Sequence, residues 1–267
     1  MHSIVCLKEV PDTETRIEVR DGRVTQEGIQ YVVNPYDEFA LEEALKWQEQ
    51  YGGQVTLLSL GPERARESIL KGLAMGADEV YHLSDEAFQG GDAYATARAL
   101  AAAIEKIGSG APEPYDAIFC GRQAVDDDNA AVGIMLAEML DLPHVSVVSK
   151  LEIDLEAKTA RAERDIEGGR EVVELPLPAV FTTQKGLNEP RYPSFRGIRQ
   201  ARQKPFTQWS VDDIGLDASE VGAAGAKLEL LEMLPPPERP PGRIIPGEPA
   251  EAAKEIVWLL REEAKVI

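Results

Sequence analysis

Short apolar runs alternate with amphipathic stretches over the first 140 residues, and this order limits the folds that the chain can adopt. Continuous apolar runs of this length are typical of strands buried on both faces of a parallel sheet. The repeated order of strand and helix predicts a doubly wound α/β domain with right-handed crossovers. The expected strands are 3–7, 54–60, 79–83 and 115–120, and the expected helices are 39–51, 62–75, 93–107 and 130–140.

The pattern changes after residue 145. Apolar and polar residues then alternate, which indicates strands with one exposed face. We expect an antiparallel hairpin that is added to the sheet or lies above it, followed by one more buried strand. The alternating runs are 145–153, 159–166 and 170–175, with a turn at Gly168 and Gly169, and the last strand is 179–183. A small hairpin is also predicted at 16–24, with its turn at Asp21 and Gly22.

The loop GRQAVDDDN (121–129) connects the strand at 115–120 to the helix at 130–140. Open α/β sheets bind ligands where parallel strands end, and free N–H groups at a helix start attract anions. The acids at 126–128 would repel a phosphate if they pointed to it, so two other interpretations remain open. One acid or Asn129 could cap the helix, or the acids could bind magnesium, although no second acidic cluster supports a metal site.

Asn34 precedes a proline and is therefore excluded from the helical region of backbone space. We expect it to be a turn residue or the N-cap of the helix that follows.

Arg196, Arg199 and Arg202 fall three residues apart on one face of a short predicted helix, in a chain whose formal net charge is −19. Such a face is either solvated or a docking surface for an acidic partner, with Phe195 as an apolar anchor at the tip of the loop 184–194. The overall charge makes nucleic acid and anionic membranes poor partners, because binding phosphates needs basic side chains.

A proline-rich spacer at 235–241 divides the chain into a domain at 1–234 and an arm at 235–267. The arm contains a predicted helix from Pro249 with an apolar stripe. This stripe could fold back onto the domain or clasp another subunit.

The sequence contains no recognisable catalytic set. Its three histidines are scattered, and it has neither a Walker A motif nor a G-x-G-x-x-G motif after the first strand. Cys6 and Cys120 fall in strand-like runs and form no disulfide or zinc pattern, which suits a reducing compartment. We expect no leader peptide, because the first strand begins at Ser3, and no membrane insertion, because no apolar run approaches about 20 residues. These features favour a carrier or binding protein over a catalyst.

Several stretches together resemble the beta subunits of electron transfer flavoproteins, in the order of that family and over nearly the whole chain. They are CLKEVPD (6–12), NPYDEFALEEAL (34–45), GPERARESILKGLAMGADE (61–79), GRQAVDDDNAAVG (121–133), RDIEGGREVVELPLPAV (164–180) and GLNEPRY (186–192).

The resemblance implies a Rossmann-like domain that binds a structural AMP, in a heterodimer whose alpha subunit binds most of one FAD. It implies electron donors among acyl-CoA and other flavin dehydrogenases, a membrane quinone oxidoreductase as acceptor, and a location in the bacterial cytoplasm or the mitochondrial matrix. The cofactor-binding residues implied by the resemblance are Cys6, Asn34, Pro35, Tyr36, Asp37, Leu60, Gly121, Arg122, Gln123, Ala124, Val125, Asp126, Asp127, Asp128, Asn129, Ala130, Ala131 and Val132. The partner-recognition residues are Arg191, Tyr192, Phe195, Arg196 and Arg199, within the segment 184–205.

The C-terminal helix resembles the family's arm onto the alpha subunit, and Tyr36 falls where the family has an aromatic residue close to the flavin. Flavin-bifurcating relatives bind a second FAD in place of AMP and tend to carry a glycine within the acidic run, so Asp127 favours AMP. The alternatives are a bifurcating beta subunit and a stand-alone nucleotide-binding protein. Phe195 replaces a common leucine, and Ala131 replaces a common glutamine of the nucleotide loop.

Overall fold

A computed structural model of the chain describes residues 1–110, 114–235, 237 and 241–267. They form two compact units, each described separately below. The first comprises Met1–Ile17 and Gln26–Leu231, and the second Glu18–Thr25 and Glu232–Ile267. Residues 236 and 238–240, which make up most of the predicted proline-rich spacer, lie outside the described residues.

A nine-stranded sheet forms the centre of the first unit, in the order β11-β10-β9-β12-β8-β1-β6-β7-β13. Neighbouring strands from β9 to β13 are parallel, whereas β10 is antiparallel to both β9 and β11. The strands are β1 (His2–Cys6), β6 (Gln54–Leu60), β7 (Glu79–Leu83), β8 (Ala117–Gly121), β9 (His144–Asp154), β10 (Thr159–Ile166), β11 (Gly169–Pro176), β12 (Ala179–Thr183) and β13 (Phe206–Trp209).

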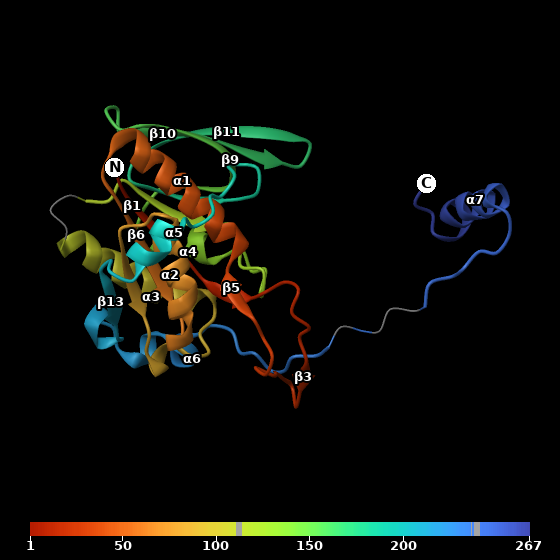
Figure 1. Cartoon of the computed structure of the whole chain (residues 1–267), viewed down its shortest axis with the longest axis horizontal. Helices are drawn as coiled ribbons and strands as arrows, with labels where there is room; N and C mark the ends of the chain where they lie inside the picture. The colour runs from red at the N-terminus through yellow and green to blue at the C-terminus, as the bar shows by residue number, and fades with distance from the viewer. Residues whose placement is uncertain (111–113, 236, 238–240) are drawn as a thin grey trace. The chain divides into compact units, whose positions relative to one another are not determined.

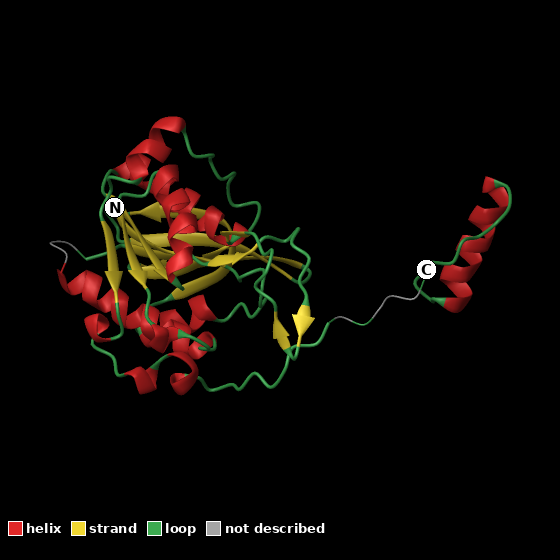
Figure 2. Ribbon diagram, turned by 60° about the horizontal axis from the view of Figure 1, so that its bottom comes forward, coloured by secondary structure: helices red, strands yellow, loops and turns green. Residues whose placement is uncertain are grey.

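Helices cover both faces of this sheet (Figures 1 and 2). One apolar cluster packs α1 (Pro35–Tyr51), α2 (Arg66–Met75) and α5 (Phe195–Ala201) on one face, and a second packs α3 (Ala93–Gly110) and α4 (Val132–Met139) on the other. Consecutive residues of β1 belong to different clusters, with Val5 in the first and Ile4 and Cys6 in the second. Burial on both faces explains why these strands read as continuous apolar runs.

The predicted doubly wound fold is confirmed, and the predicted hairpin is added to the edge of the sheet. Three details differ from the sequence-based predictions. A 3-10 turn at Glu63–Ala65 precedes α2, so Pro62 stands just before this turn and not at the first position of a long helix. The edge strand β13 was not predicted, because its four residues are at most half-buried and carry no continuous apolar run. A short ladder of β2 (Glu9–Pro11) and β5 (Tyr31–Val33) was also not predicted.

The second unit contains the small hairpin of β3 (Val19–Arg20) and β4 (Arg23–Val24), whose predicted turn at Asp21 and Gly22 is present with positive φ at both residues. Its helix α7 (Pro249–Trp258) begins at the predicted proline and continues into a π-helical turn at Leu259–Glu263. Within α7, all of which the structure describes, no residue is buried.

Candidate functional site

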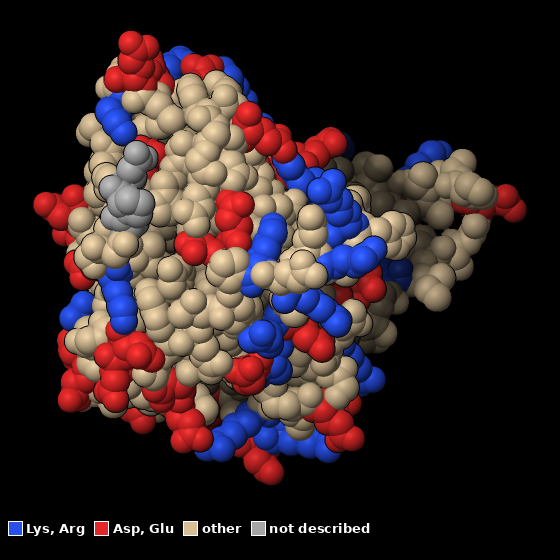
Figure 3. Space-filling model, turned by 60° about the vertical axis from the view of Figure 1, so that its left-hand side comes forward, with Lys and Arg blue, Asp and Glu red and all other residues tan. Residues whose placement is uncertain are grey.

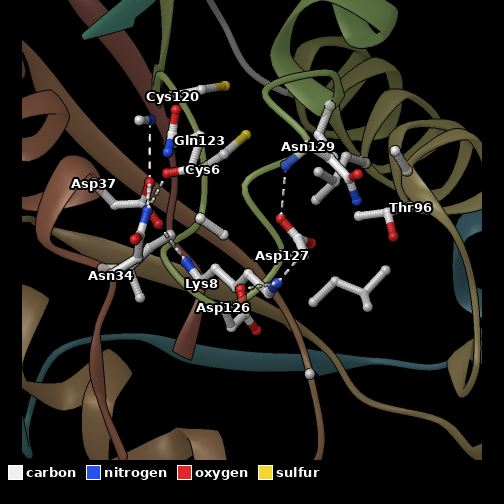
Figure 4. Close-up of a pocket in the computed structure, with 18 of the residues that line it drawn as sticks. Cys6, Lys8, Asn34, Asp37, Thr96, Cys120, Gln123, Asp126, Asp127 and Asn129 are labelled. Atoms are coloured by element: carbon white, nitrogen blue, oxygen red, sulfur yellow. Dashed lines mark hydrogen bonds and ion pairs between the residues drawn. The ribbon is translucent and has the colours of Figure 1, made fainter. Parts of the chain in front are cut away.

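A cavity of about 400 Å³ opens at the carboxyl ends of β1 and β8. The chain places β6 on one side of β1 and β8 on the other, so the direction of strand addition reverses there. Open α/β sheets bind ligands at such a switch point. Figure 4 shows side chains from β1, the start of α1 and the β8–α4 loop converging on this space.

The cavity brings together most of the predicted cofactor-binding residues. Those that line it are Cys6, Asn34, Asp37, Leu60, Gly121, Arg122, Gln123, Ala124, Asp126, Asp127, Asn129, Ala130, Ala131 and Val132. Pro35, Tyr36, Val125 and Asp128 are not among the residues that line it. The Tyr36 ring instead lies beneath the guanidinium of Arg122, 5.3 Å from ring centroid to Cζ.

Asn34 and Asp37 join three chain segments at the base of the cavity. The Asn34 amide donates to Asp37 Oδ1 and to the Gln123 carbonyl, both at 2.9 Å, and its Oδ1 accepts from Val125 N–H at 3.2 Å. Asp37 accepts from Gly121 N–H at 3.0 Å and from Lys8 N–H at 2.7 Å. Asn34 holds the expected N-cap position of α1, but its side chain does not cap the helix because it spans to the β8–α4 loop.

Asp37 is a buried acid. Burial raises the pKa of its carboxyl to about 7, against the lowering effect of the hydrogen bonds from Lys8, Asn34 and Gly121. The side chain therefore binds or releases a proton near neutral pH while it holds the ends of β1 and β8 to the start of α1.

The prediction that one of the acids or Asn129 caps α4 is wrong. The N-cap is Ala131, with no side-chain hydrogen bond, because positive φ angles at Asp128 and Ala130 extend the loop and delay the helix to Val132. The Asp127 carboxylate accepts from Asn129 N–H, within the loop, and Asp128 accepts from the Gln123 amide. The first N–H groups of α4 thus have no side-chain cap and adjoin the cavity.

Lys8 offsets part of the negative charge of the acidic loop. Its Nζ lies 2.8 Å from Asp126 Oδ1 and 3.2 Å from Asp127 Oδ2. Burial by itself lowers the pKa of Lys8, because it disfavours the charged ammonium group. The hydrogen bonds and negative charges of the two aspartates outweigh this effect and raise the pKa above its ordinary value. The pairing reduces the repulsion that Asp126 and Asp127 would exert on a phosphate, since both carboxylates face the ammonium group of Lys8.

Sequence reasoning missed the part of the cavity contributed by other strand ends. The loop before α3 adds Gly90, Gly91 and Asp92, and the first turn of α3 adds Thr96. Leu58 comes from β6, and Arg64 from the 3-10 turn after it. A buried strand followed by a loop and a helix indicated the β8–α4 loop, and the same pattern is present at 79–93. It would have identified the loop before α3 as part of the cavity.

The predicted recognition segment is exposed and basic. Ser194 caps α5 by accepting from Gly197 N–H at 3.0 Å. Tyr192 and Phe195 are each 93% exposed and Ile198 is 50% exposed. A hollow of about 370 Å³ lies beside Phe195, between Arg196 and Arg199. Figure 3 shows one face of the molecule on which basic side chains gather in one area, with acidic side chains among them and around them.

Arg191 anchors this segment to α1. Its guanidinium lies 2.8 Å and 2.9 Å from the two carboxylate oxygens of Glu42, and Glu42 also accepts from Arg191 N–H. The hydrogen bonds to Glu42 and Glu49 raise the pKa of Arg191. The Asn188 amide donates to the Phe39 carbonyl at 3.0 Å and to Glu43 at 2.9 Å. Arg191 therefore faces α1, whereas Tyr192 and Phe195 face solvent.

Within the described ranges, no group of three or more His, Cys, Asp or Glu side chains is arranged to hold a metal ion. Over the same residues, no helix is both long enough and apolar enough to span a bilayer.

Comparison with known proteins gives a consistent result over the whole chain. The model of the electron transfer flavoprotein domain matches residues 21–214. The chain is 42% identical to the electron transfer flavoprotein subunit beta of Thermoanaerobacterium thermosaccharolyticum, over 96% of each chain. It is 38% identical to the subunit of the same name from Bacillus subtilis, over the full length of both. It is also 40% identical to the caffeyl-CoA reductase-Etf complex subunit CarD of Acetobacterium woodii, over 98% of this chain and 99% of that one.

Proposed function

The chain belongs to the beta-subunit family of electron transfer flavoproteins, and from that membership we propose that it is the beta subunit of a heterodimeric electron carrier that holds a structural AMP. An alpha subunit would bind most of one FAD, which supplies the redox chemistry when bound. Electrons would come from acyl-CoA and other flavin dehydrogenases and leave to a membrane quinone oxidoreductase. The chain contributes binding and orientation.

The observation that carries the AMP proposal is the cavity at the switch point. Its volume of about 400 Å³ lies within the usual range of small-molecule sites. Apolar side chains would hold the adenine, and the start of α4 would hold the phosphate, because its N–H groups lack a side-chain cap and its dipole favours an anion. The apolar lining includes Cys6, Leu58, Leu60, Phe88, Leu100, Cys120 and Val132.

The charges around the cavity also suit a mononucleotide. Lys8 is paired with Asp126 and Asp127, which offsets part of the negative charge of these acids without a magnesium ion. Arg64 and Arg122 add positive charge to the lining. A bound AMP would stabilise the folded protein by about 2.7 kcal/mol at a hundredfold excess over its dissociation constant.

The proposal is tested by counting the nucleotides released when the co-expressed heterodimer is denatured. We expect one FAD and one AMP per heterodimer. Removal of AMP should lower the melting temperature without abolishing reduction of the flavin by a dehydrogenase. An unchanged melting temperature after verified AMP removal would contradict the structural role.

A matched pair of variants assigns the AMP to this cavity. Ala131→Phe places a ring in the cavity and should abolish AMP retention, whereas Ala157→Phe makes the same replacement on an exposed turn and should retain one AMP. Full AMP occupancy in Ala131→Phe would place the nucleotide elsewhere.

A second candidate is a beta subunit that binds a second FAD in place of AMP. The chain is 40% identical to a subunit of a caffeyl-CoA reductase-Etf complex, so its relatives include subunits of larger complexes. The same count separates the two, because this version would release two FAD molecules and no AMP. A stand-alone nucleotide-binding protein would instead purify as a colourless monomer that binds no alpha subunit.

We also propose that dehydrogenases dock on the segment 184–205. Phe195 would be its apolar anchor, and Arg196 and Arg199 would attract an acidic surface, since interfaces often centre on an aromatic residue within a polar ring. Tyr192 is equally exposed and extends the same surface.

A further inference from the structure

The two cysteines of the chain are neighbours in the fold although they lie far apart in sequence. The parallel pairing of β1 with β8 runs up to Val5 and Phe119, so the next residues, Cys6 and Cys120, lie side by side. Adjacent strands are about 4.8 Å apart. Both cysteines belong to the apolar cluster on the α3 and α4 face, and Figure 4 shows their two sulfur atoms close together.

Both thiols are free, and both line the proposed nucleotide cavity. Cys6 is 8% exposed and Cys120 is 6% exposed. A reagent small enough to enter the cavity can therefore meet both sulfur atoms, whereas a protein-sized thiol cannot. Apolar packing explains one buried cysteine at such a position, but it does not require that the chain's two cysteines be adjacent at the base of a ligand cavity.

We propose that Cys6 and Cys120 form a redox-sensitive dithiol, which closes to an intrachain disulfide by exchange with a low-molecular-weight disulfide that enters the cavity. The Cα separation of neighbouring strands falls within the range that a disulfide spans, about 4.4–6.8 Å in general. The Cβ atoms must approach to about 3.5–4.5 Å, which requires a local shift of the strands. Such a bond is strained and hence easily reduced, as expected of a reversible site.

The reaction consists of two exchanges. The Cys6 sulfur, on losing its proton, attacks the small disulfide, forms a mixed disulfide and releases the first small thiol, which takes up that proton. The Cys120 sulfur then attacks Cys6 Sγ, forms the intrachain bond and releases the second small thiol with the Cys120 proton. The protein loses two electrons and two protons, and the small disulfide gains them.

The environment of Cys120 explains the assignment of the first attack to Cys6. Its interaction with the Cys6 thiol, together with burial and the nearby Asp37 carboxylate, raises the pKa of Cys120. The reactive species in thiol exchange is the thiolate, so Cys120 is the poorer first nucleophile. Once Cys6 carries a mixed disulfide, the adjacency of Cys120 favours ring closure over release.

The test uses the full chain in its purified complex, from which bound nucleotide has first been removed. The complex is incubated with oxidised glutathione, quenched with acid, and this chain is weighed by denaturing, non-reducing mass spectrometry. We expect loss of two hydrogens, restored by dithiothreitol, with little glutathione adduct. Cys6→Ser and Cys120→Ser should each be unable to lose two hydrogens.

A second measurement uses the wild-type chain and therefore does not depend on the folding of a serine variant. Phenylarsine oxide bridges closely spaced dithiols, and the wild-type chain should bind one equivalent under native conditions. Two independent glutathione adducts on the wild-type chain, or thiols that react with neither probe until the protein is unfolded, would overturn the proposal.

One arm of the experiment depends on the proposed function. If AMP occupies the cavity, AMP at a hundredfold excess over its dissociation constant should slow disulfide formation about a hundredfold, because only the empty cavity admits the reagent. Disulfide formation at an unchanged rate would contradict AMP binding in this cavity but not the proposal of a redox-sensitive dithiol. Absence of the disulfide in nucleotide-free protein would contradict the dithiol proposal but not the AMP proposal.

Discussion

Asp37 links the stability of the protein to pH. Its folded-state pKa of about 7 lies above the ordinary value of 3.8, so the folded state binds the proton more tightly than the unfolded chain. This contribution to stability is fully present below about pH 4 and is lost as the pH rises through 7. Because one pKa unit corresponds to about 1.36 kcal/mol, the loss is on the order of a few kcal/mol.

The measurement is urea unfolding of the purified protein at pH 5, 6, 7 and 8. We expect the free energy of unfolding to fall across this range. Asp37→Asn removes the titration and should give a flatter pH profile, at a cost of about 1–3 kcal/mol, because the new amide cannot accept from all three N–H donors. Equal pH slopes in the two proteins would show that Asp37 does not titrate in this window.

Arg191 is expected to stabilise the recognition segment through geometry as well as charge. The planar guanidinium bonds both oxygens of Glu42, and the single ammonium group of Arg191→Lys cannot do so. Glu42 is buried, so an unmet hydrogen bond there costs about 1–3 kcal/mol.

We therefore expect Arg191→Lys to lower the free energy of unfolding and to speed hydrogen exchange at 192–203. The matched control is Arg196→Lys, which changes an exposed arginine of the same segment and should leave both quantities near their wild-type values. If both variants behave alike, the contact between Arg191 and α1 is not what holds the segment.

At the scale of elements, the close approach of β8 to the start of α1 depends on one glycine. A Cβ built on Gly121 would lie 2.7 Å from Tyr36 Cβ and would also meet Asp37 Oδ1. Gly121→Ala should therefore destabilise the protein by at least about 1–3 kcal/mol, the usual cost of overpacking, and weaken AMP retention.

Gly169→Ala is the matched control, because a Cβ added at Gly169 would meet no atom within 4 Å and the φ of this residue is not positive. It should change the melting temperature little. Equal losses of stability in the two variants would mean that the α1–β8 contact can relax.

The elements were more predictable from the sequence than the contacts between them. Strands such as β1 and β8 contain continuous apolar runs, which directly reflect burial on both faces. The short strand β13 lacks such a run, and its place at the edge depends on pairing with β7. Tertiary pairing of this kind leaves no local signal.

In the candidate site, too, the elements could be predicted from the sequence but the contacts between them could not. A strand end followed by a helix start placed the β8–α4 loop at the cavity, and the family motifs added the start of α1. The pairing of Lys8 with Asp126 joins residues 118 positions apart, so no local pattern could reveal it. The backbone turn that delays α4 is likewise not visible in the sequence, and with it Asp126 and Asp127 are directed toward Lys8 instead of α4.

At the scale of the whole molecule, charge is unevenly distributed. The chain has a formal net charge of −19, yet Arg196, Arg199 and Arg202 are exposed along α5 and beside it. If dehydrogenases dock there, local attraction must overcome the general repulsion of an acidic partner. Local attraction of this kind acts mainly on the association rate and is screened by salt, with a Debye length of about 10 Å at 0.1 M.

Charge reversal tests this docking site. With an acyl-CoA dehydrogenase as electron donor to the heterodimer, Arg199→Glu should raise the KM for the flavoprotein severalfold at low ionic strength and leave kcat nearly unchanged. The difference should shrink as salt is added, because screening weakens the lost attraction. Arg170→Glu makes the same change of charge on β11, where the guanidinium is exposed and its ion pairs contribute little to stability. An equal rise of KM in both variants would show that only the total charge of the protein matters. A rise of KM in Arg199→Glu that does not depend on salt would show that electrostatic attraction of the dehydrogenase does not act at α5.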